Sequence, residues 1–391
     1  MKYNFDKVID RSGTSAEKVE GLKHIWGRTD LIPLWVADMD FATAPFVTDA
    51  IRKRCENEVL GYTGKPDSYY NAIINWVKQR YDLIVTKEVI NFVPGIVPGI
   101  GMAMNCFTQK GDKVMIQPPV YHPFAWVTTR KERTLVINPL RWENGMYRMD
   151  LDAFREQIKG CKLFILCNPH NPGGVVWTEA ELRAIADICY DEKVLVFSDE
   201  IHADLTLPPH THRPFATVSE KARMNSVTFM SPSKAFNMPG LSASHALIFN
   251  EDLRKCFRIY MDAGELDMGH VFAFLSVEAA YSHGTEWLDQ CLAYIQGNID
   301  FVDEFLKKHA PKIKAIRPEA SYLVWLDCRE LELSQKDLNE FFVDKAHLAL
   351  NDGEMFGKEG IGFMRLNVAS PRCIIEKAMK QLADAYQLYI K

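Results

Sequence analysis

Polar residues follow several short apolar runs of this sequence, at the point where each run ends. Residues 168–174 (NPHNPGG) follow KLFILC, residues 199–202 (DEIH) follow VLVFS, and residues 231–234 (SPSK) follow SVTFM. Residues 118–121 (PPVY) follow KVMIQ, and residues 94–101 (PGIVPGIG) form a glycine-rich turn into an expected helix. Because loops at the carboxyl ends of the strands form the ligand crevice of an open α/β sheet, we expect these segments to meet at one site.

The residue types in these segments suit one kind of ligand. A glycine turn before a helix offers free backbone N–H groups and the positive end of the helix dipole to a phosphate. Ile96 and Val97 are the expected donors, because Pro98 has no N–H. Tyr121 can cover a flat ring, and the carboxylate of Asp199 can hold a ring nitrogen protonated.

Two further groups complete this set. The amide of Asn171 can donate to a phenolate, and Lys234, at the end of its own strand, can form a Schiff base with an aldehyde. The ligand that fits all of these groups is pyridoxal 5′-phosphate, whose pyridinium ring serves as an electron sink. No metal is expected, and no CxxC pair indicates a zinc ribbon or a thioredoxin-like centre.

Short apolar runs and amphipathic stretches predict the elements that position these groups. The predicted strands are residues 113–117, 134–138, 162–167, 194–198, 226–230 and 245–249. The predicted helices among them are residues 43–58, opened by Thr43 as a cap, residues 69–81, and residues 179–191, capped by Thr178. Alternation of buried strands with helices predicts an α/β fold with a largely parallel sheet flanked by helices on both faces.

The pattern changes after about residue 270 and predicts a smaller α+β unit. Its expected elements are a long helical region over residues 271–308, a strand in ASYLVWLD, a helix over 335–345, a strand in FMRLNV and a final helix over 374–389. We therefore predict an N-terminal segment (1–42) that packs with the small domain, a large cofactor-binding domain (43–285) and a small C-terminal domain (286–391).

The ordered motifs carry a resemblance to a known family. Asn-Pro-x-Asn-Pro-Gly-Gly, Ser-Asp-Glu-Ile and Ser-x-Ser-Lys, with 28 residues from Asn171 to Asp199 and 35 from Asp199 to Lys234, resemble the fold-type I pyridoxal-phosphate enzymes of the aspartate aminotransferase superfamily. Residues 35–41 (WVADMDF) and 233–241 (SKAFNMPGL) are similar to the MalY/PatB-type cystathionine β-lyases, which are carbon–sulfur lyases. The resemblance covers nearly the whole chain and implies that the mainly parallel sheet is mixed.

The resemblance implies a role for each residue that faces the cofactor ring. Lys234 would bond to the cofactor and move the Cα proton, Asp199 would pair with the pyridine nitrogen, and Asn171 would donate to the cofactor O3′. Tyr121 would stack on the ring and border the substrate, and His202 is expected to orient the Asp199 side. Taken singly, each has an ordinary alternative, such as a helix cap for Asp199 or a turn for Asn171.

The remaining assignments concern the phosphate and the substrate. Ser231 and Ser233 are candidate phosphate ligands, with Ser231 favoured and local strand capping as the alternative. Tyr62 matches the family tyrosine that reaches the cofactor phosphate of the neighbouring subunit, which implies a homodimer with shared active sites. Arg365 matches the arginine that binds the substrate α-carboxylate in a bidentate fork, and the backbone N–H of Ala37 meets the same carboxylate.

One segment departs from the family pattern. Many members of the superfamily carry a glycine where this chain has Ala320-Ser321-Tyr322. A Cβ at that site requires a negative φ or tolerates strain. We therefore do not carry over side-chain specificity, and Tyr322 is a candidate pocket residue.

The family implies β-elimination from an amino acid with a sulfur leaving group at Cβ, which gives pyruvate, ammonia and a thiol. The expected substrate is a small sulfur amino acid, and the choice among cystathionine, cysteine and bulkier S-conjugates stays open. The first alternative is an aminotransferase, which uses the same residues. The second is a regulatory binding protein on the same fold, although the presence of Lys234, Asp199, Asn171 and Arg365 argues against an inactive scaffold.

Composition restricts the remaining classes. The 391 residues carry 46 Lys and Arg against 51 Asp and Glu, so the net charge of −5 offers no basic field for nucleic acid or an anionic membrane. The first residues contain no apolar signal region, and no apolar stretch is long enough to span a membrane. Nine scattered cysteines, which we expect to be structural, indicate a reduced, cytoplasmic protein.

Overall fold

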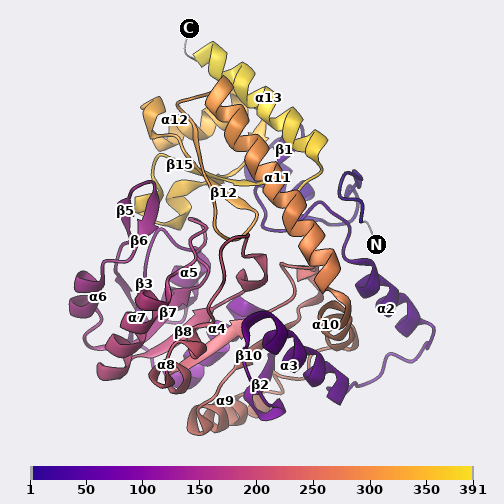
Figure 1. The fold of residues 1–391 in the computed structure, drawn as a ribbon, viewed down its shortest axis with the longest axis vertical. Coiled ribbons are helices and arrows are strands. Elements are labelled where there is room, and N and C mark those ends of the chain that lie inside the picture. Colours follow the sequence, from indigo (N-terminus) through magenta and orange to yellow (C-terminus); the bar gives the residue numbers. More distant parts are fainter. Residues whose placement is uncertain (1–2, 390–391) are drawn as a thin grey trace.

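The computed structural model describes residues 3–389, and within these residues the larger sheet has seven strands (Figure 1). The strands are β2 (Ile90–Val93), β3 (Lys113–Ile116), β4 (Thr134–Ile137), β7 (Cys161–Cys167), β8 (Leu195–Asp199), β9 (Ser226–Met230) and β10 (Ser244–Leu247). Their order across the sheet is β2-β10-β9-β8-β7-β3-β4. Only the two pairings of β10 are antiparallel among these seven strands, which confirms the mixed, mainly parallel sheet.

All six predicted strands are present, with ends within two residues of the expected ones. The patterns do not predict β2, a strand of four residues that are all buried and that follow a short 3-10 turn. Its sequence, INFV, is interrupted by Asn91 and so lacks the continuous apolar run from which the other strands were predicted. Its pairing with β10, which lies more than 150 residues further along the chain, decides its conformation.

Helices cover both faces of this sheet (Figure 1). One face packs against α4 (Ile96–Phe107), α5 (Pro123–Arg130) and α9 (Glu251–Ala263). The other packs against α6 (Leu151–Gln157), α7 (Glu179–Asp191), α8 (Glu220–Met224), α3 (Asp67–Tyr81) and α10 (Val271–His283). Successive strand residues alternate between the two cores, as Ile165 and Leu166 of β7 do, because side chains of a strand point to opposite faces in turn.

The predicted start of one helix is confirmed and that of another is wrong. Thr178 caps α7 in a capping box with Glu181, as its position before an apolar period predicts. In contrast, α2 (Pro45–Cys55) has Ala44 at its cap position. The Thr43 hydroxyl instead donates to the carbonyl of Asn237, at 2.7 Å, because the chain before α2 passes beside residues 237–241.

The long helical region predicted over residues 271–308 is two helices. They are α10 and α11 (Thr285–His309), separated at Gly284. A Cβ at Gly284 would lie 2.2 Å from the carbonyl oxygen of Ala280 and 2.3 Å from a ring carbon of Phe236, so no larger residue fits this junction. The close approach of another segment therefore decides where the first helix ends.

The second unit is built on an antiparallel sheet of four strands within the described residues. Its order is β11 (Lys314–Ile316), β12 (Leu323–Asp327), β15 (Phe363–Asn367) and β14 (Asn351–Asp352), and the helices beside it are α11, α12 (Gln335–Glu340) and α13 (Arg372–Tyr389). A small hairpin of β5 (Arg141–Glu143) and β6 (Met146–Arg148) lies outside both sheets. One apolar cluster runs from α3 and α10 to β12, β15 and α13, so the two units share a core.

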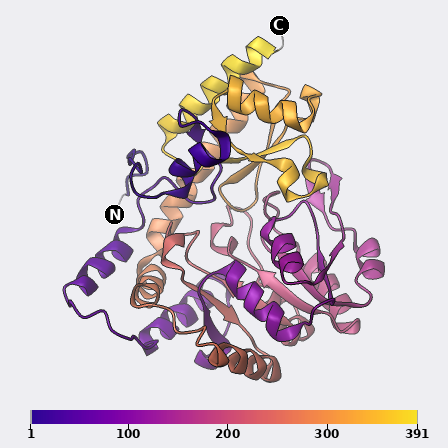
Figure 2. The ribbon, with the colours of Figure 1, turned by 180° about the vertical axis from the view of Figure 1, so that it is seen from behind.

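The N-terminal segment lies against this second unit (Figure 2). It contains α1 (Glu17–Trp26) and β1 (Ile32–Pro33), and β1 pairs in parallel with β13 (Leu348–Ala349). The domain boundaries at residues 42 and 285 stay a prediction, and residues 1–2 and 390–391 at the outer ends lie outside the described chain. No helix among residues 3–389 is both long and apolar enough to cross a membrane.

Candidate active site

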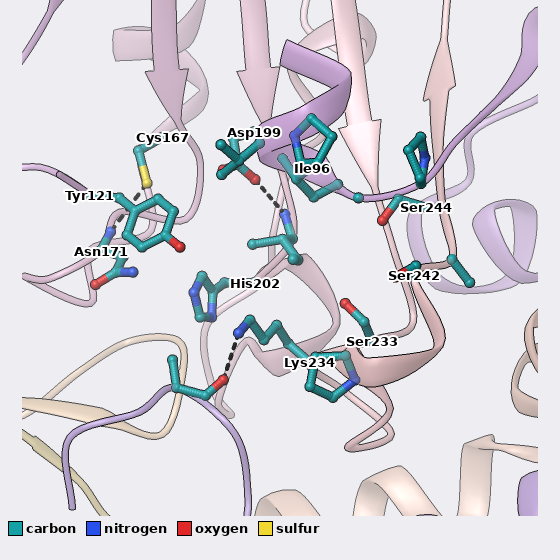
Figure 3. A pocket seen from close by; sticks show the side chains of 18 residues that line it. Ile96, Tyr121, Cys167, Asn171, Asp199, His202, Ser233, Lys234, Ser242 and Ser244 are labelled. Carbon is teal, nitrogen blue, oxygen red and sulfur yellow. Dashed lines mark hydrogen bonds between the residues drawn. The ribbon is translucent and has the colours of Figure 1, made fainter. Parts of the chain in front are cut away.

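Segments from the carboxyl ends of β7, β8 and β9 meet at a cavity of about 310 Å³ (Figure 3). Nine of the predicted site residues line it: Ala37, Ile96, Val97, Tyr121, Asn171, Asp199, His202, Ser233 and Lys234. They converge because parallel strands end at the same edge of a sheet. The cavity is not bordered by Ser231, Arg365 or Tyr62 of the same chain.

Lys234 extends into this cavity from the turn after β9 (Figure 3). Its Nζ donates to the carbonyl oxygen of Ala37 at 2.6 Å. Burial lowers the pKa of Lys234 to about 8, because the charged ammonium loses solvation. The unprotonated amine that a nucleophile or a general base requires is therefore much more abundant near neutral pH than that of an exposed lysine.

Asp199, the last residue of β8, faces the cavity with its carboxyl buried. Burial raises the pKa of Asp199 to about 7. The hydrogen bond that its Oδ1 accepts from the backbone N–H of Ile201, at 3.1 Å, has the opposite effect on this pKa but is the weaker of the two. No cation among the described residues forms an ion pair with this carboxyl. A protonated ring nitrogen in the cavity would supply that cation and favour the ionised carboxylate.

His202 borders the cavity directly. Burial, followed by the charges of Lys234 and Arg365, lowers the pKa of His202 to about 3, so the ring is neutral. Its Nδ1 is buried and has no hydrogen-bond partner among the described residues. The expected orienting hydrogen bond to Asp199 is likewise absent there, since the bond that this carboxyl accepts comes from Ile201.

Asn171 links the cavity to Arg365, which lies behind it on β15. The guanidinium donates to Asn171 Oδ1 at 3.0 Å, to Asn351 Oδ1 at 2.5 Å and to the Trp35 carbonyl at 3.2 Å. Because Arg365 occupies the amide oxygen of Asn171, the amide nitrogen faces the cavity as a donor (Figure 3). Burial lowers the pKa of Arg365 to about 10, so the side chain stays cationic at neutral pH.

The start of α4 forms one wall of the cavity. The first backbone hydrogen bond of this helix joins the Gly99 N–H to the Gly95 carbonyl. The N–H groups of Ile96 and Val97 therefore have no partner within the helix and lie at its positive end. This arrangement offers hydrogen bonds and a favourable field to an anionic group such as a phosphate.

Hydroxyl groups lie opposite the start of α4 (Figure 3). Ser233 lines the cavity, but Ser231, the favoured candidate, does not. The Ser231 hydroxyl instead donates to the Ala243 carbonyl at 2.7 Å and accepts from the Ser233 N–H at 3.1 Å. Ser242 and Ser244 also line the cavity, and sequence reasoning missed both. The available signal was their place in the sequence, since Ser242 directly follows the lysine motif and Ser244 is the first residue of the next strand, β10.

Two tyrosines differ in their relation to the cavity of their own chain. Tyr121 lines it, and burial raises the pKa of the Tyr121 phenol, so the ring is neutral. Tyr62 lies in the segment between α2 and α3, and 98% of its surface is exposed. It does not reach the cavity of its own chain.

The segment that departs from the family pattern holds a strained residue. Ser321 has a φ of 82°, in the left-handed region that residues with a Cβ seldom adopt, and its N–H donates to the Leu205 carbonyl at 2.8 Å. The next residue, Tyr322, does not line the cavity. It is buried, and its hydroxyl donates to the Ala37 carbonyl at 2.9 Å.

These groups fit pyridoxal 5′-phosphate. The unpaired N–H groups of Ile96 and Val97 and the hydroxyl of Ser233 suit its phosphate. The buried carboxyl of Asp199, which forms no ion pair with any described residue, suits its ring nitrogen, and the Lys234 amine suits its aldehyde. A set of side chains that served only folding would not leave a buried carboxyl unpaired beside a cavity.

Comparisons with known proteins give the same result. The profile of the family described as aminotransferase class I and II matches residues 29–382. Cystathionine beta-lyase PatB of Bacillus subtilis is 38% identical over 98% of this chain and 99% of its own length. Protein MalY of Escherichia coli is 30% identical over 98% of both chains.

Two solved structures are similar throughout. Cystalysin of Treponema denticola, which contains pyridoxal 5′-phosphate, has a TM-score of 0.96 and 33% identity over the full length of both chains. The pyridoxal-phosphate-bound C–S lyase of Staphylococcus hominis has a TM-score of 0.91 and 35% identity, over 99% of this chain and 98% of its own.

The raised pKa of Asp199 predicts how the cofactor-free chain responds to pH. The folded carboxyl keeps its proton up to about pH 7, whereas the unfolded one loses it near pH 4, so stability falls as the pH rises between these values. We expect Asp199→Asn to unfold at higher urea concentration than the unmodified chain at pH 8, and the difference to disappear at pH 4. Asp49→Asn, at an exposed position, is the control. If the stability of Asp199→Asn and that of the unmodified chain depend on pH in the same way, the prediction is contradicted.

Proposed function

The chain belongs to the aminotransferase class I and II family, and from this premise we propose that it removes a thiol from Cβ of cystathionine- or cysteine-type amino acids. It is a pyridoxal-phosphate-dependent carbon–sulfur lyase. The observation that carries the reaction type is similarity over the full length to cystathionine β-lyases and C–S lyases. The more distant aspartate aminotransferase of Bacillus subtilis is 23% identical.

Lys234 is the proposed base. When bound, pyridoxal 5′-phosphate supplies a ring that accepts the electron pair left at Cα. The amine of Lys234, with a pKa lowered by burial to about 8, is suited to take the Cα proton and to return it later as an acid. Asp199 is suited to keep the ring nitrogen protonated, and Asn171 to donate from its free amide nitrogen.

Arg365 is the proposed anchor of the substrate α-carboxylate. Its guanidinium is held between Asn171 and Asn351, and a planar fork of this kind binds a carboxylate in a bidentate manner. The N–H of Ala37 borders the cavity, in front of Asn171 and Arg365, and forms no hydrogen bond within the described chain. Two fixed contacts to the carboxylate would restrict rotation about Cα, so the proton to be removed faces Lys234.

The overall reaction consumes one water and forms pyruvate, ammonia and a thiol. The Cα–H and Cβ–S bonds break, the proton passes to Lys234, and the sulfur leaves as a thiolate that is protonated to the thiol. Water then replaces nitrogen at Cα, so the C–N bond breaks, ammonia leaves and the water oxygen becomes the keto oxygen of pyruvate. Cystathionine would give homocysteine, and cysteine would give sulfide. Substrate and water together have the same overall oxidation level as the three products, so no external oxidant or reductant is needed.

A homodimer in the cytoplasm is the proposed state. Val59, Leu60 and Tyr62 expose 72%, 58% and 98% of their surfaces on one segment, which is a large apolar area to leave in water. A second copy of the chain that covers this segment would bring Tyr62 to the partner's phosphate site. All nine cysteines are free, which supports a reducing compartment.

A product assay distinguishes this function from its alternatives. With cystathionine and no keto acid, we expect sustained, equal release of pyruvate and thiol, because elimination regenerates the enzyme at each turnover. Lys234→Ala should lower the rate by at least about 10²-fold, and the exposed Lys110→Ala should not change it. One equivalent of keto acid per site without thiol would indicate an aminotransferase. A cellular phenotype that Lys234→Ala retains would support a regulatory binding protein.

The shared active site is tested by mixing inactive subunits. Tyr62→Ala lacks the tyrosine for its partner, and Lys234→Ala lacks the base of its own site. A hybrid dimer holds one site with both residues intact, so an equal mixture should recover about a quarter of the unmodified activity. If mixing after subunit exchange recovers no activity, Tyr62 does not serve the partner's site.

A further inference from the structure

The backbone of residues 36–38 holds the amine of Lys234. The Ala37 carbonyl accepts from Lys234 Nζ at 2.6 Å and from the Tyr322 hydroxyl at 2.9 Å. Asn367 Nδ2 donates to the carbonyls on either side, those of Val36 and Asp38, at 2.7 Å each. Three side chains therefore meet this short segment from different elements, and its position determines where the Lys234 amine lies.

The same segment carries a compact cluster of four charges, which we call the N-terminal charge cluster and which consists of Arg11, Lys18, Asp38 and Asp40. Arg11 contacts Asp38 at 2.6 Å and Asp40 at 3.0 Å. Lys18 lies 2.8 Å from Asp40 and 3.6 Å from Asp38, and its side chain is fully buried. A lysine is almost never buried without anionic partners, so the cluster is held together by its own charges.

We propose that the N-terminal charge cluster is a positioning device for Lys234. It fixes the backbone at Ala37, which receives the amine, and it sets the negative charge that Asp38 presents beside that amine. The proposal rests on the lyase function above, in which Lys234 moves the Cα proton. None of the four residues lines the cavity of the cofactor site, so they act through Ala37 and through the electric field.

The charges that surround Lys234 determine in which direction its pKa should shift when one of them is removed. Burial lowers the pKa of Lys234, Asp38 and Asp199 raise it, and Arg365 lowers it. The neighbouring ring of His202 is neutral, because burial lowers its pKa to about 3. Arg11 and Lys18 offset the charge of Asp38, so removal of either cation and removal of Asp38 should shift the Lys234 pKa in opposite directions.

The test measures the pKa of Lys234 in the full chain after pyridoxal 5′-phosphate has been removed. Acetic anhydride acetylates the unprotonated amine, and peptide mass spectrometry gives the extent of acetylation of Lys234 at each pH. Asp38→Asn should lower this pKa and Lys18→Met should raise it, each by about 0.5 or more. Asp30→Asn, which breaks an ion pair elsewhere, should leave it unchanged. If Lys18→Met does not fold, Arg11→Met carries the same expected sign.

Only opposite shifts support the proposal. If both variants shift the Lys234 pKa in the same direction, the loop is displaced and the charges do not control the amine. If either variant leaves the pKa unchanged, the charge that it removes has no effect on Lys234. Either result overturns the proposal. The reloaded enzymes should show the same opposite displacement in the pH profile of kcat. Because acetylation requires no turnover, failure of the lyase assay and failure of this proposal are distinguishable.

A second, independent observation concerns two cysteines. Cys106 on α4 and Cys256 on α9 are 150 residues apart in the sequence, yet their Sγ atoms lie 3.4 Å apart. Cys256 is exposed and Cys106 is partly exposed, so small oxidants can reach the pair. The expectation that the cysteines are purely structural does not account for two free thiols in contact at the surface.

We infer that this pair is a reversible oxidation site for peroxides. The Cys256 thiolate attacks one peroxide oxygen and the O–O bond breaks, which gives a sulfenic acid and a hydroxide that takes a proton from solvent to leave as water. The Cys106 thiol then attacks that sulfur, which forms the disulfide and releases a second water. Two electrons leave the two thiols and reduce hydrogen peroxide. Burial raises the pKa of Cys106, so the exposed Cys256 is the first nucleophile.

Hydrogen peroxide applied to the holoenzyme tests this site. We expect an intact mass lower by two hydrogens, a linked peptide that contains Cys106 and Cys256, and full reversal by dithiothreitol. Cys256→Ser should abolish the link, and Cys373→Ser, at another exposed thiol, should not. Oxidation of Cys256 to sulfinic acid without a link, or a link through any other cysteine, would overturn the inference.

Discussion

The burial of an amine and a carboxyl beside one cavity is the constraint on which the rest of the structure depends. Burial lowers the pKa of Lys234 and raises that of Asp199, because each loses solvation in its charged form. Neither forms an ion pair within hydrogen-bond distance among residues 3–389, although each lies in the electric field of the other. The surrounding protein has to hold both groups against the tendency of polar side chains to reach water.

The two units contribute different parts of this arrangement. The seven-stranded sheet presents Asn171, Asp199 and Lys234 from strand ends at one edge, and α4 adds the positive end of its dipole. The small sheet presents Arg365 from β15, and the N-terminal segment presents Ala37. The apolar cluster that joins the units fixes these contributions relative to one another, because closely packed cores deform little.

Strain and charge are concentrated where the units meet. Ser321 adopts a left-handed φ beside Tyr322, whose hydroxyl holds the Ala37 carbonyl. The buried Lys18 stabilises the next residues of the same segment through Asp40. Non-glycine residues in this region of φ and fully buried lysines both cost stability unless their surroundings compensate, so they mark positions where placement matters for function.

Sequence patterns were enough to predict a largely parallel sheet, most strand ends to within two residues and the cofactor, and the family resemblance added that the sheet is mixed. Short apolar runs and the polar residues that follow them can be recognised from neighbouring positions in the sequence. Because the carboxyl ends of parallel strands meet at one edge of the sheet, these polar residues could be expected to lie together. The cap at Thr178 was predictable for the same reason, since capping involves residues three apart. The order of the motifs along the chain then indicated a lyase of one family.

Only the tertiary structure decided which neighbours those residues have. It turned Ser231 toward Ala243 and left Ser233 in the cavity, and it placed Arg365 behind Asn171. It also brought Lys18 to Asp40 and joined β2 to β10, across separations that no local pattern encodes. Contacts of this kind form only when distant segments pack together, so the sequence determined the chemistry available and packing determined its arrangement.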